Sequence, residues 1–366
     1  LFGRKHVPGD FWGALAAMLV ALPASIAFGV TVYAAIAPSY AALGALAGII
    51  GATVIGLVAS TLGGTDRLIS APCAPAAAVL SAFAIELTGQ GVAPEVIVLL
   101  LILLGVLAGV VQLLLGFIGI GRLIKYIPYP VVSGYLSGVG LIIIGSQIPK
   151  FVGAAVETGW WTALMTPWAW DWRSLAIGLA TVLAAVIGPK LTKRVPGTIL
   201  GVVAGLLTYI GLATQDPKLW EVTGNHLVIG ALGASMEGYF GSIVGRWHEI
   251  GDLRLGQIAG LLGSALTLAA LLSIDTLKTC VVIDQLTRTR HQPDRELVAQ
   301  GIANIASSAV GGIPGAGTMG ATLVNLNSGA KTRVSGVLEG LLSLVAALVF
   351  GSFLAWVPVA ALAGIL

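Results

Sequence analysis

The stretch GGIPGAGTMGA at residues 311–321 interrupts an apolar run with glycines and a proline. A matching interruption, LISAPCAPA, occupies residues 68–76. Proline prevents a regular helix through its own position but is well tolerated in the first turn of a new helix. Each stretch is therefore predicted to be a short extended segment that leads into a half-helix. We expect the N-termini of the two half-helices to meet near Ala74 and Ala321.

The composition of the chain places it in a lipid bilayer. Of its 366 residues, 57% are hydrophobic and only 10% are charged, whereas about 25% are charged in a typical soluble domain. Disordered chains are richer still in charge. The formal net charge of +3 gives no reason to expect a nucleic-acid partner. We therefore expect an integral, multi-pass membrane protein that is surrounded by lipid.

Stretches without charged residues mark the expected spans, because a helix needs about 20 apolar residues to cross a bilayer. Lysines and arginines concentrate in the loops on one side, which predicts that the N-terminus lies inside the cell. Residues 222–250 carry Glu237, Arg246 and His248 and are predicted to be an interfacial or re-entrant segment. The expected spans are 11–36, 40–62, 72–88, 95–120, 130–148, 174–191, 196–213, 255–283, 297–312, 318–333, 335–351 and an incomplete one that begins near residue 357.

The two interrupted spans, the third and the tenth, predict an internal repeat. Residues 1–213 would form a first repeat of seven spans, residues 214–254 a connection, and residues 255–366 the first part of a second repeat. An odd number of spans per repeat inverts one repeat relative to the other in the membrane. Interrupted spans at matching positions are typical of transporter binding sites. The alternative is that both interruptions are structural kinks.

Half-helices that begin inside a membrane attract anions. Irregular backbone at this depth is tolerated only where protein buries it or where it lines a cavity. Each half-helix offers free backbone N–H groups and the positive end of its dipole. Two such ends that face each other would form an anion site without Arg or Lys.

A carboxylate in the eighth span is the second candidate for function. Asp275 lies inside an otherwise apolar run, and Thr279 follows one turn later on the same helical face. A carboxylate at this depth is costly and indicates function by default. Asp275 and Thr279 are predicted to bind a coupling cation, with H⁺ favoured slightly over Na⁺, and no other cofactor is expected. The alternative is an Asp275–Lys278 pair that only holds helices together.

Other polar residues carry less information. Glu339 is a weaker candidate for a second proton site, because Lys331 and Arg333 suggest that it lies near the membrane surface. The four histidines and two cysteines show no catalytic or metal-ligand spacing. The chain is therefore predicted not to be an enzyme and to hold no metal.

Five stretches of the sequence resemble the sulfate permease (SulP) family of anion transporters. The resemblance implies a prokaryotic-type member of this family, in the inner membrane of a bacterial cell. The resemblance runs along essentially the whole chain. It implies an all-helical fold of fourteen spans in two inverted repeats of seven, divided into core and gate domains. It also implies that the last two spans and a cytoplasmic STAS domain are missing from this chain. The stretches are PASIAF (23–28), GTDRLISAPCAP (64–75), KYIPYPVVSGYLSGVG (125–140), SIDTLKTCVVIDQLTRTRH (273–291) and GGIPGAGTMGATLVNLNSGAKTRVSG (311–336).

The resemblance also implies the function and the residues that carry it. Similar cyanobacterial bicarbonate transporters hold their coupling cation at the positions of Asp275 and Thr279. The implied activity is secondary transport of sulfate, bicarbonate or a dicarboxylate by H⁺- or Na⁺-coupled symport with alternating access, and a homodimer is expected. The substrate site would be lined by Phe28, Cys73, Ala74, Gly320 and Ala321.

The chain departs from its relatives at three polar positions, so the particular anion stays open. Ala24 stands where many relatives have Gln, Cys73 where the bicarbonate transporters have Thr, and Ala321 where some relatives have Arg. Two other functions also stay open. An uncoupled anion channel would gain nothing from a buried carboxylate. A nucleobase:cation symporter of the same architecture needs a second carboxylate in the tenth span, and residues 311–330 contain none.

Overall fold

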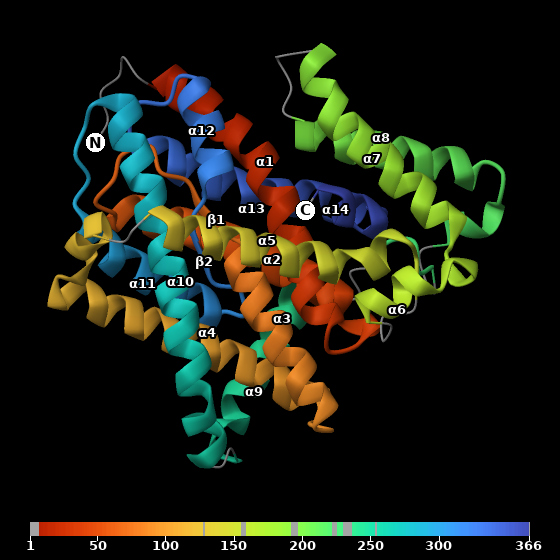
Figure 1. The fold of residues 1–366 in the computed structure, drawn as a ribbon, viewed down its shortest axis with the longest axis horizontal. Coiled ribbons are helices and arrows are strands. Elements are labelled where there is room, and N and C mark those ends of the chain that lie inside the picture. Colours follow the sequence, from red (N-terminus) through yellow and green to blue (C-terminus); the bar gives the residue numbers. More distant parts are fainter. Residues whose placement is uncertain are drawn as a thin grey trace.

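A computed structural model describes residues 7–126, 129–154, 159–191, 197–221, 225–229, 236–252 and 255–365. These residues form helices and two strands of three residues each (Figure 1). In chain order the elements are α1 (Val7–Ala34), α2 (Ala41–Leu62), β1 (Ser70–Pro72), α3 (Ala74–Gly89), α4 (Pro94–Ile118), α5 (Tyr129–Phe151), α6 (Trp160–Met165), α7 (Trp172–Leu191), α8 (Gly197–Ala213), α9 (Met236–His248), α10 (Leu255–Thr287), α11 (Pro293–Ala309), β2 (Gly315–Gly317), α12 (Met319–Asn327), α13 (Val334–Leu354) and α14 (Val359–Ile365).

The lengths of the helices fit a membrane protein. Five described segments are long and apolar enough to cross a bilayer: Val7–Ala34, Pro38–Leu62, Pro94–Ile118, Trp172–Leu191 and Gly260–Thr287. The helices α3 and α12 are short because β1 and β2 replace the other part of each span. The tenth span, expected over 318–333, therefore contains a helix only as far as Asn327.

The helices form two groups. In the first group, α1 to α4 pack with α10 to α13, and the most extensive pairings join α4 to α11, α1 to α2, and α2 to α13. In the second group, α5 to α8 pack with α14, and α7 and α8 project to one side of the molecule (Figure 1). The first group contains both strands, so it positions the half-helices that follow them.

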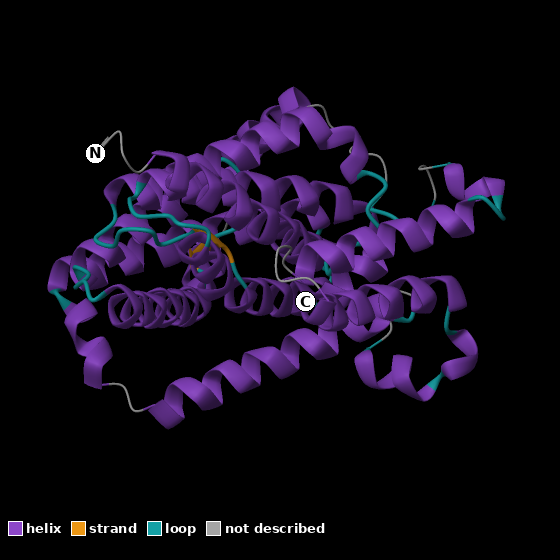
Figure 2. Ribbon diagram, turned by 90° about the horizontal axis from the view of Figure 1, so that it is seen from above, coloured by secondary structure: helices purple, strands orange, loops and turns teal. Residues whose placement is uncertain are grey.

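The two interrupted stretches are extended segments followed by half-helices, as the sequence predicts. β1 and β2 are fully buried among helices (Figure 2) and pair in antiparallel register, with Ser70 opposite Gly317 and Pro72 opposite Gly315. The half-helix α3 begins at the expected residue, and α12 begins two residues before the expected one, at Met319. The pairing satisfies backbone groups that lipid could not satisfy.

Side chains from α10 and α11 hold β2 in the bundle. Asn304 Nδ2 donates to Gly315 O at 2.9 Å, and Asn304 Oδ1 accepts from Gly315 N at 2.8 Å. Gly317 N donates to Thr276 Oγ1 at 3.0 Å, and Thr279 Oγ1 donates to Gly317 O at 2.9 Å. These amide and hydroxyl groups complete the pairing of the strand on the side that β1 does not cover.

The ambiguous segment 222–250 contains the helix α9. Its Trp247 Nε1 donates to Ala309 O at 2.9 Å, and Tyr239 OH donates to Gly311 O at 2.8 Å. The helix therefore packs on the end of α11 and on the turn that leads to β2. Residues 222–224 and 230–235 of this segment lie outside the described residues.

The close approach of β1 and β2 predicts a stability difference between two glycines of the same stretch. In Gly315→Ala the new Cβ would collide with the carbonyl oxygen of Ala71, and overpacking of this kind costs about 1–3 kcal/mol. In Gly320→Ala the new Cβ would meet no described atom within 4 Å. Thermal unfolding of the purified protein in detergent should show a lower Tm for Gly315→Ala and a nearly unchanged Tm for Gly320→Ala. Equal Tm values would contradict the strand pairing.

Candidate functional site

The N-termini of α3 and α12 both begin at the strand pair. Because β1 and β2 are antiparallel and each leads directly into its helix, the two helices run away from the strands in opposite directions. In the described structure neither N-cap residue, Cys73 or Thr318, forms a side-chain hydrogen bond to its own helix. The first turns of both helices thus keep N–H groups and a positive dipole end for a bound anion.

Of the five expected lining residues, Cys73 and Ala74 lie at the start of α3, and Gly320 and Ala321 lie in the first turn of α12. Phe28 of α1 and Cys73 are buried in one apolar cluster, and the partly buried Ala74 packs against it. Gly320, in the first turn of α12, is exposed, and a Cβ there would face open space among the described residues. The expected site therefore has an apolar wall beside α3 and an open face on α12.

Ala321 lies differently from its neighbour Gly320. Ala321 is 3% exposed and packs with Ala17, Ala21, Ile69 and the β1 residue Ala71. Ala321 can contribute its backbone to the first turn of α12, but its side chain points into the protein. A large side chain at this position would disturb packing before it blocked a ligand.

Asp275 and Lys278 form an ion pair within α10. Lys278 Nζ lies 2.7 Å from Asp275 Oδ1, and the two side chains are 21% and 13% exposed. The pair that the sequence offered as the alternative is therefore present, and both of its residues belong to one helix. The Cys73 thiol interacts electrostatically with both residues, so the pair lies beside the N-terminus of α3.

Thr279 connects this helix to the second broken span. Its hydroxyl has one proton, which is shared between Asp275 O at 3.0 Å and Gly317 O at 2.9 Å, and its side chain is buried. The arrangement brings together a carboxylate, an ammonium group, a hydroxyl and two helix N-termini. Such a set can bind an anion and exchange a proton or a cation beside it.

The sequence analysis missed the residues that support the strands from α11. Gln300 Nε2 donates to Ser70 Oγ at 2.7 Å and to Glu296 Oε1 at 3.1 Å. Asn304 Nδ2 also donates to Gln112 Oε1 of α4 at 2.6 Å. Glu296, Gln300 and Asn304 are spaced four residues apart, so they share one face of α11. This polar row in a membrane helix was the sequence signal that could have revealed them.

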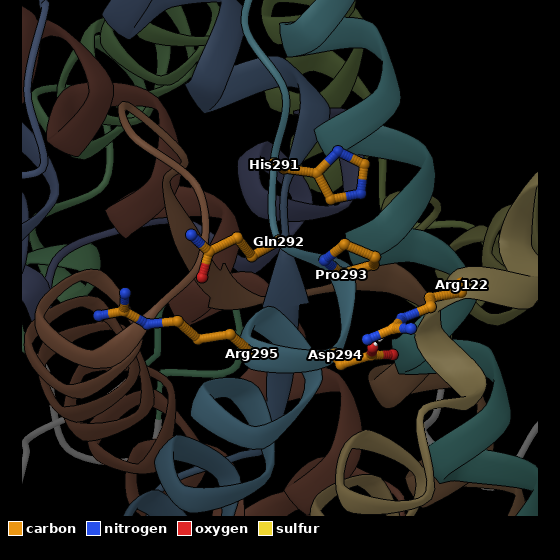
Figure 3. A pocket seen from close by; sticks show the side chains of 6 residues that line it. All are labelled: Arg122, His291, Gln292, Pro293, Asp294 and Arg295. Atoms are coloured by element: carbon orange, nitrogen blue, oxygen red, sulfur yellow. Dashed lines mark hydrogen bonds and ion pairs between the residues drawn. The ribbon is translucent and has the colours of Figure 1, made fainter.

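A pocket of about 420 Å³ lies elsewhere, where α10 turns into α11 (Figure 3). Arg122 Nε is 2.6 Å from Asp294 Oδ2 at its edge, and the Arg122 side chain is 77% exposed. The pocket contains none of the predicted site residues and opens at the end of the helices. It is lined by Arg122, His291, Gln292, Pro293, Asp294 and Arg295.

Known proteins resemble this chain in sequence. The bicarbonate transporter BicA of Picosynechococcus sp. is 31% identical over 379 residues, which cover 99% of this chain and 61% of that protein. The putative sulfate transporter YvdB of Bacillus subtilis is 25% identical over 357 residues, which cover 95% of this chain and 61% of that protein. The chain thus spans about three fifths of the length of these relatives.

Solved structures resemble it in fold. The transmembrane domain of a cyanobacterium bicarbonate transporter BicA superposes with a TM-score of 0.81 at 30% identity, covering 100% of this chain and 87% of that chain. SLC26A9 superposes with a TM-score of 0.78 at 17% identity, covering 99% of this chain and 57% of that chain. The two proteins therefore share a fold.

A match to a family model along nearly the whole chain shows the family to which the chain belongs. Residues 7–366 match the model of the sulfate permease family, in agreement with the motifs and with the helical fold. The chain is therefore a multi-pass integral membrane protein that belongs to the sulfate permease family.

Proposed function

We propose that this chain forms the transport site of a secondary transporter for a small anion, with bicarbonate as the first candidate and sulfate as the second. The observation that carries the proposal is the pair of uncapped N-termini of α3 and α12 at one strand pair. The printed names of the relatives, a bicarbonate transporter and a putative sulfate transporter, support this class of substrate. A dicarboxylate is a third candidate.

The charge of the site favours a monovalent anion. Each helix N-terminus is equivalent to about half a positive charge, so two of them supply about one. The Asp275–Lys278 pair adds no net charge while Asp275 is ionised. A proton on Asp275 would leave the Lys278 ammonium uncompensated and add a second positive charge. The site with an ionised Asp275 suits bicarbonate, which carries one negative charge. The site with a protonated Asp275 suits a dianion such as sulfate.

The same pair favours H⁺ over Na⁺ as the coupling ion. Lys278 Nζ already lies against Asp275 Oδ1, and its positive charge repels a second cation. A proton can bind the carboxylate without displacing the ammonium group. Thr279, whose hydroxyl bonds to Gly317 O, would transmit a change at Asp275 to β2. We therefore assign the coupling role to Asp275, with Thr279 as its partner on α10.

Alternating access would use the two groups of helices. We propose that α1 to α4 with α10 to α13 form the core and that α5 to α8 with α14 form part of the gate. Residues 1–213 and the available part of the second half, 255–366, would be inverted repeats joined by 214–254. The equivalent placement of the strand–helix units β1–α3 and β2–α12 supports this division.

The second group of helices is suited to contact lipid or a second copy of the chain. Large apolar side chains on α7 and α8 are exposed, which is expected for helix faces in a bilayer. We propose a homodimer in the inner membrane of a bacterium. The exposed side chains include Leu179, Leu183, Val186, Val203 and Leu207.

The direct test is uptake of labelled bicarbonate, sulfate and dicarboxylates into proteoliposomes, with and without pH and Na⁺ gradients. Accumulation driven by a pH gradient would support the proposal. Uptake that never exceeds equilibrium under any gradient would instead favour the uncoupled channel. A nucleobase substrate is disfavoured because α12 carries no carboxylate.

Blocking the open face of α12 should abolish transport. Gly320→Trp would place an indole at the first turn of the half-helix, where a Cβ meets no described atom within 4 Å. We expect anion uptake to fall at least tenfold, while the melting temperature stays close to wild type. Gly89→Trp is the matched control, because Gly89 is equally unobstructed among the described residues but lies at the far end of α3. Normal uptake by folded Gly320→Trp would refute the site.

Removing the charge of Asp275 should separate binding from coupling. Asp275→Asn keeps the shape of the protonated side chain, so we expect measurable anion binding together with loss of gradient-driven accumulation. Binding is measured by calorimetry and accumulation by uptake into proteoliposomes. Asp284→Asn, on the same helix but bonded to His291 near its end, is the control. If Asp275→Asn still concentrated the anion with the same cation as wild type, Asp275 would not be the coupling residue.

A further inference from the structure

Glu339 of α13 is a fully buried carboxylate outside the site described above. The residue is 0% exposed, although Lys331 and Arg333 lie close to the start of its helix. Its Oε1 accepts a hydrogen bond from Ser343 Oγ at 3.2 Å. Its Oε2 is buried and has no hydrogen-bond partner among the described residues. A buried polar atom without a partner requires an explanation.

The surroundings of Glu339 are polar but uncharged. Oε2 faces α2 at Gly56, where an added Cβ would lie 2.8 Å from it. Thr53 and Ser60 share this face of α2 with Gly56, and their hydroxyl oxygens are also buried without a partner in the described part of the chain. Three buried oxygens without a described partner therefore lie on the interface between α2 and α13, and Glu339 Oε2 is the only one of the three that belongs to an ionisable group.

Among the described residues that pack around Glu339, none offers a cation to neutralise it. The helices that pack most extensively on α13 are α2 and α1. α2 contains no charged residue, and the only one in α1, Asp10, accepts bonds from Lys331 N and Thr332 at the start of α13. Arg333, six residues or about 9 Å along the helix from Glu339, pairs with Asp66 at 2.7 Å.

An ionised carboxylate in this position would be costly, because an isolated charge loses its hydration without compensation. A protonated carboxyl removes the charge and turns one oxygen into a donor. We propose that Glu339 is a proton-binding site within the group of helices that carries the half-helices, and that its proton favours anion binding. The effect on anion binding rests on the proposed function, whereas the proton-binding site does not.

The link to the anion site runs through α2. Gly51 of α2 contacts Pro72 and Ile313, which flank the two broken segments, and Gly56 lies five residues, about 7.5 Å, further along the helix. An ionised Glu339 on the order of 10 Å from a bound monovalent anion would weaken its affinity roughly tenfold at an effective dielectric constant of about 20. Protonation removes this repulsion.

Buried hydroxyl groups flank Glu339 on its own helix. Ser335, Glu339 and Ser343 are spaced four residues apart, so they lie on one face of α13, and all three are buried. Ser335 Oγ donates to Thr332 O at 2.9 Å and accepts from Asn325 Nδ2 at 2.9 Å. The face of α13 that carries Glu339 is therefore polar on both sides of the carboxyl group.

The first test asks whether Glu339 holds a dissociable proton. Infrared spectra of the protein in lipid bilayers should contain a protonated-carboxyl band at neutral pH that is absent from Glu339→Gln and decreases on alkaline titration. Glu86→Gln, at an exposed carboxylate, should keep the band. Ser343→Ala should keep it at a shifted frequency, because it removes the bond to Oε1. A wild-type spectrum without the band, or a band unaffected by pH, would overturn the proposal.

The second test measures anion affinity by calorimetry, with bicarbonate and sulfate as separate probes. We expect wild-type affinity to fall on the order of tenfold across the pH range in which the infrared band disappears. Glu339→Gln should keep the acid-side affinity throughout, and Asp275→Asn should keep the Glu339-dependent fall. The same pH dependence in Glu339→Gln as in wild type would refute the link to anion binding. Failure of the wild type to bind either anion would refute the proposed substrates, while the infrared result still decides the proton site.

Discussion

The pairing of β1 with β2 is the interaction on which the rest of the structure depends. Two membrane spans are interrupted, and every backbone group in the interruptions needs a partner that lipid cannot provide. The strands supply partners to each other, and Asn304, Thr276 and Thr279 supply the remaining ones to β2. Once the strands are held in this way, the half-helices begin beside them, and their N-termini lie where we propose that the anion binds.

The candidate site contains few charges, so the proposed anion binding depends on helix dipoles and on one ion pair. The N-termini of α3 and α12 would attract an anion without adding a charge that must be desolvated when the site is empty. Asp275 and Lys278 bring opposite charges that cancel each other. Thr279 joins this pair to the strands. Electrostatics and backbone geometry are thereby connected through α10, and Glu339 would add a second proton near the same strands from the side of α2 and α13.

The motif-based expectations were most accurate where backbone chemistry was decisive. Pro72 and Pro75 exclude a continuous helix, so the start of α3 was predicted to the residue, and the glycines of 311–320 located α12 to within two residues. Side-chain directions were less predictable. Gly320 and Ala321 are adjacent, yet one faces open space and the other packs on α1 and β1. A helical turn determines the angle between neighbours, but only the packed partners decide which of them faces the ligand.

The sequence by itself determined that this is a multi-pass membrane protein with two interrupted spans, because hydrophobicity and proline act locally and do not depend on distant residues. Only the tertiary structure decided which polar groups meet. It placed Asn304 against Gly315, joined Thr279 to Gly317, and buried Glu339 between helices although charges flank its span. These outcomes depend on helix rotation and on contacts between residues far apart in the chain, which no local pattern of residues encodes.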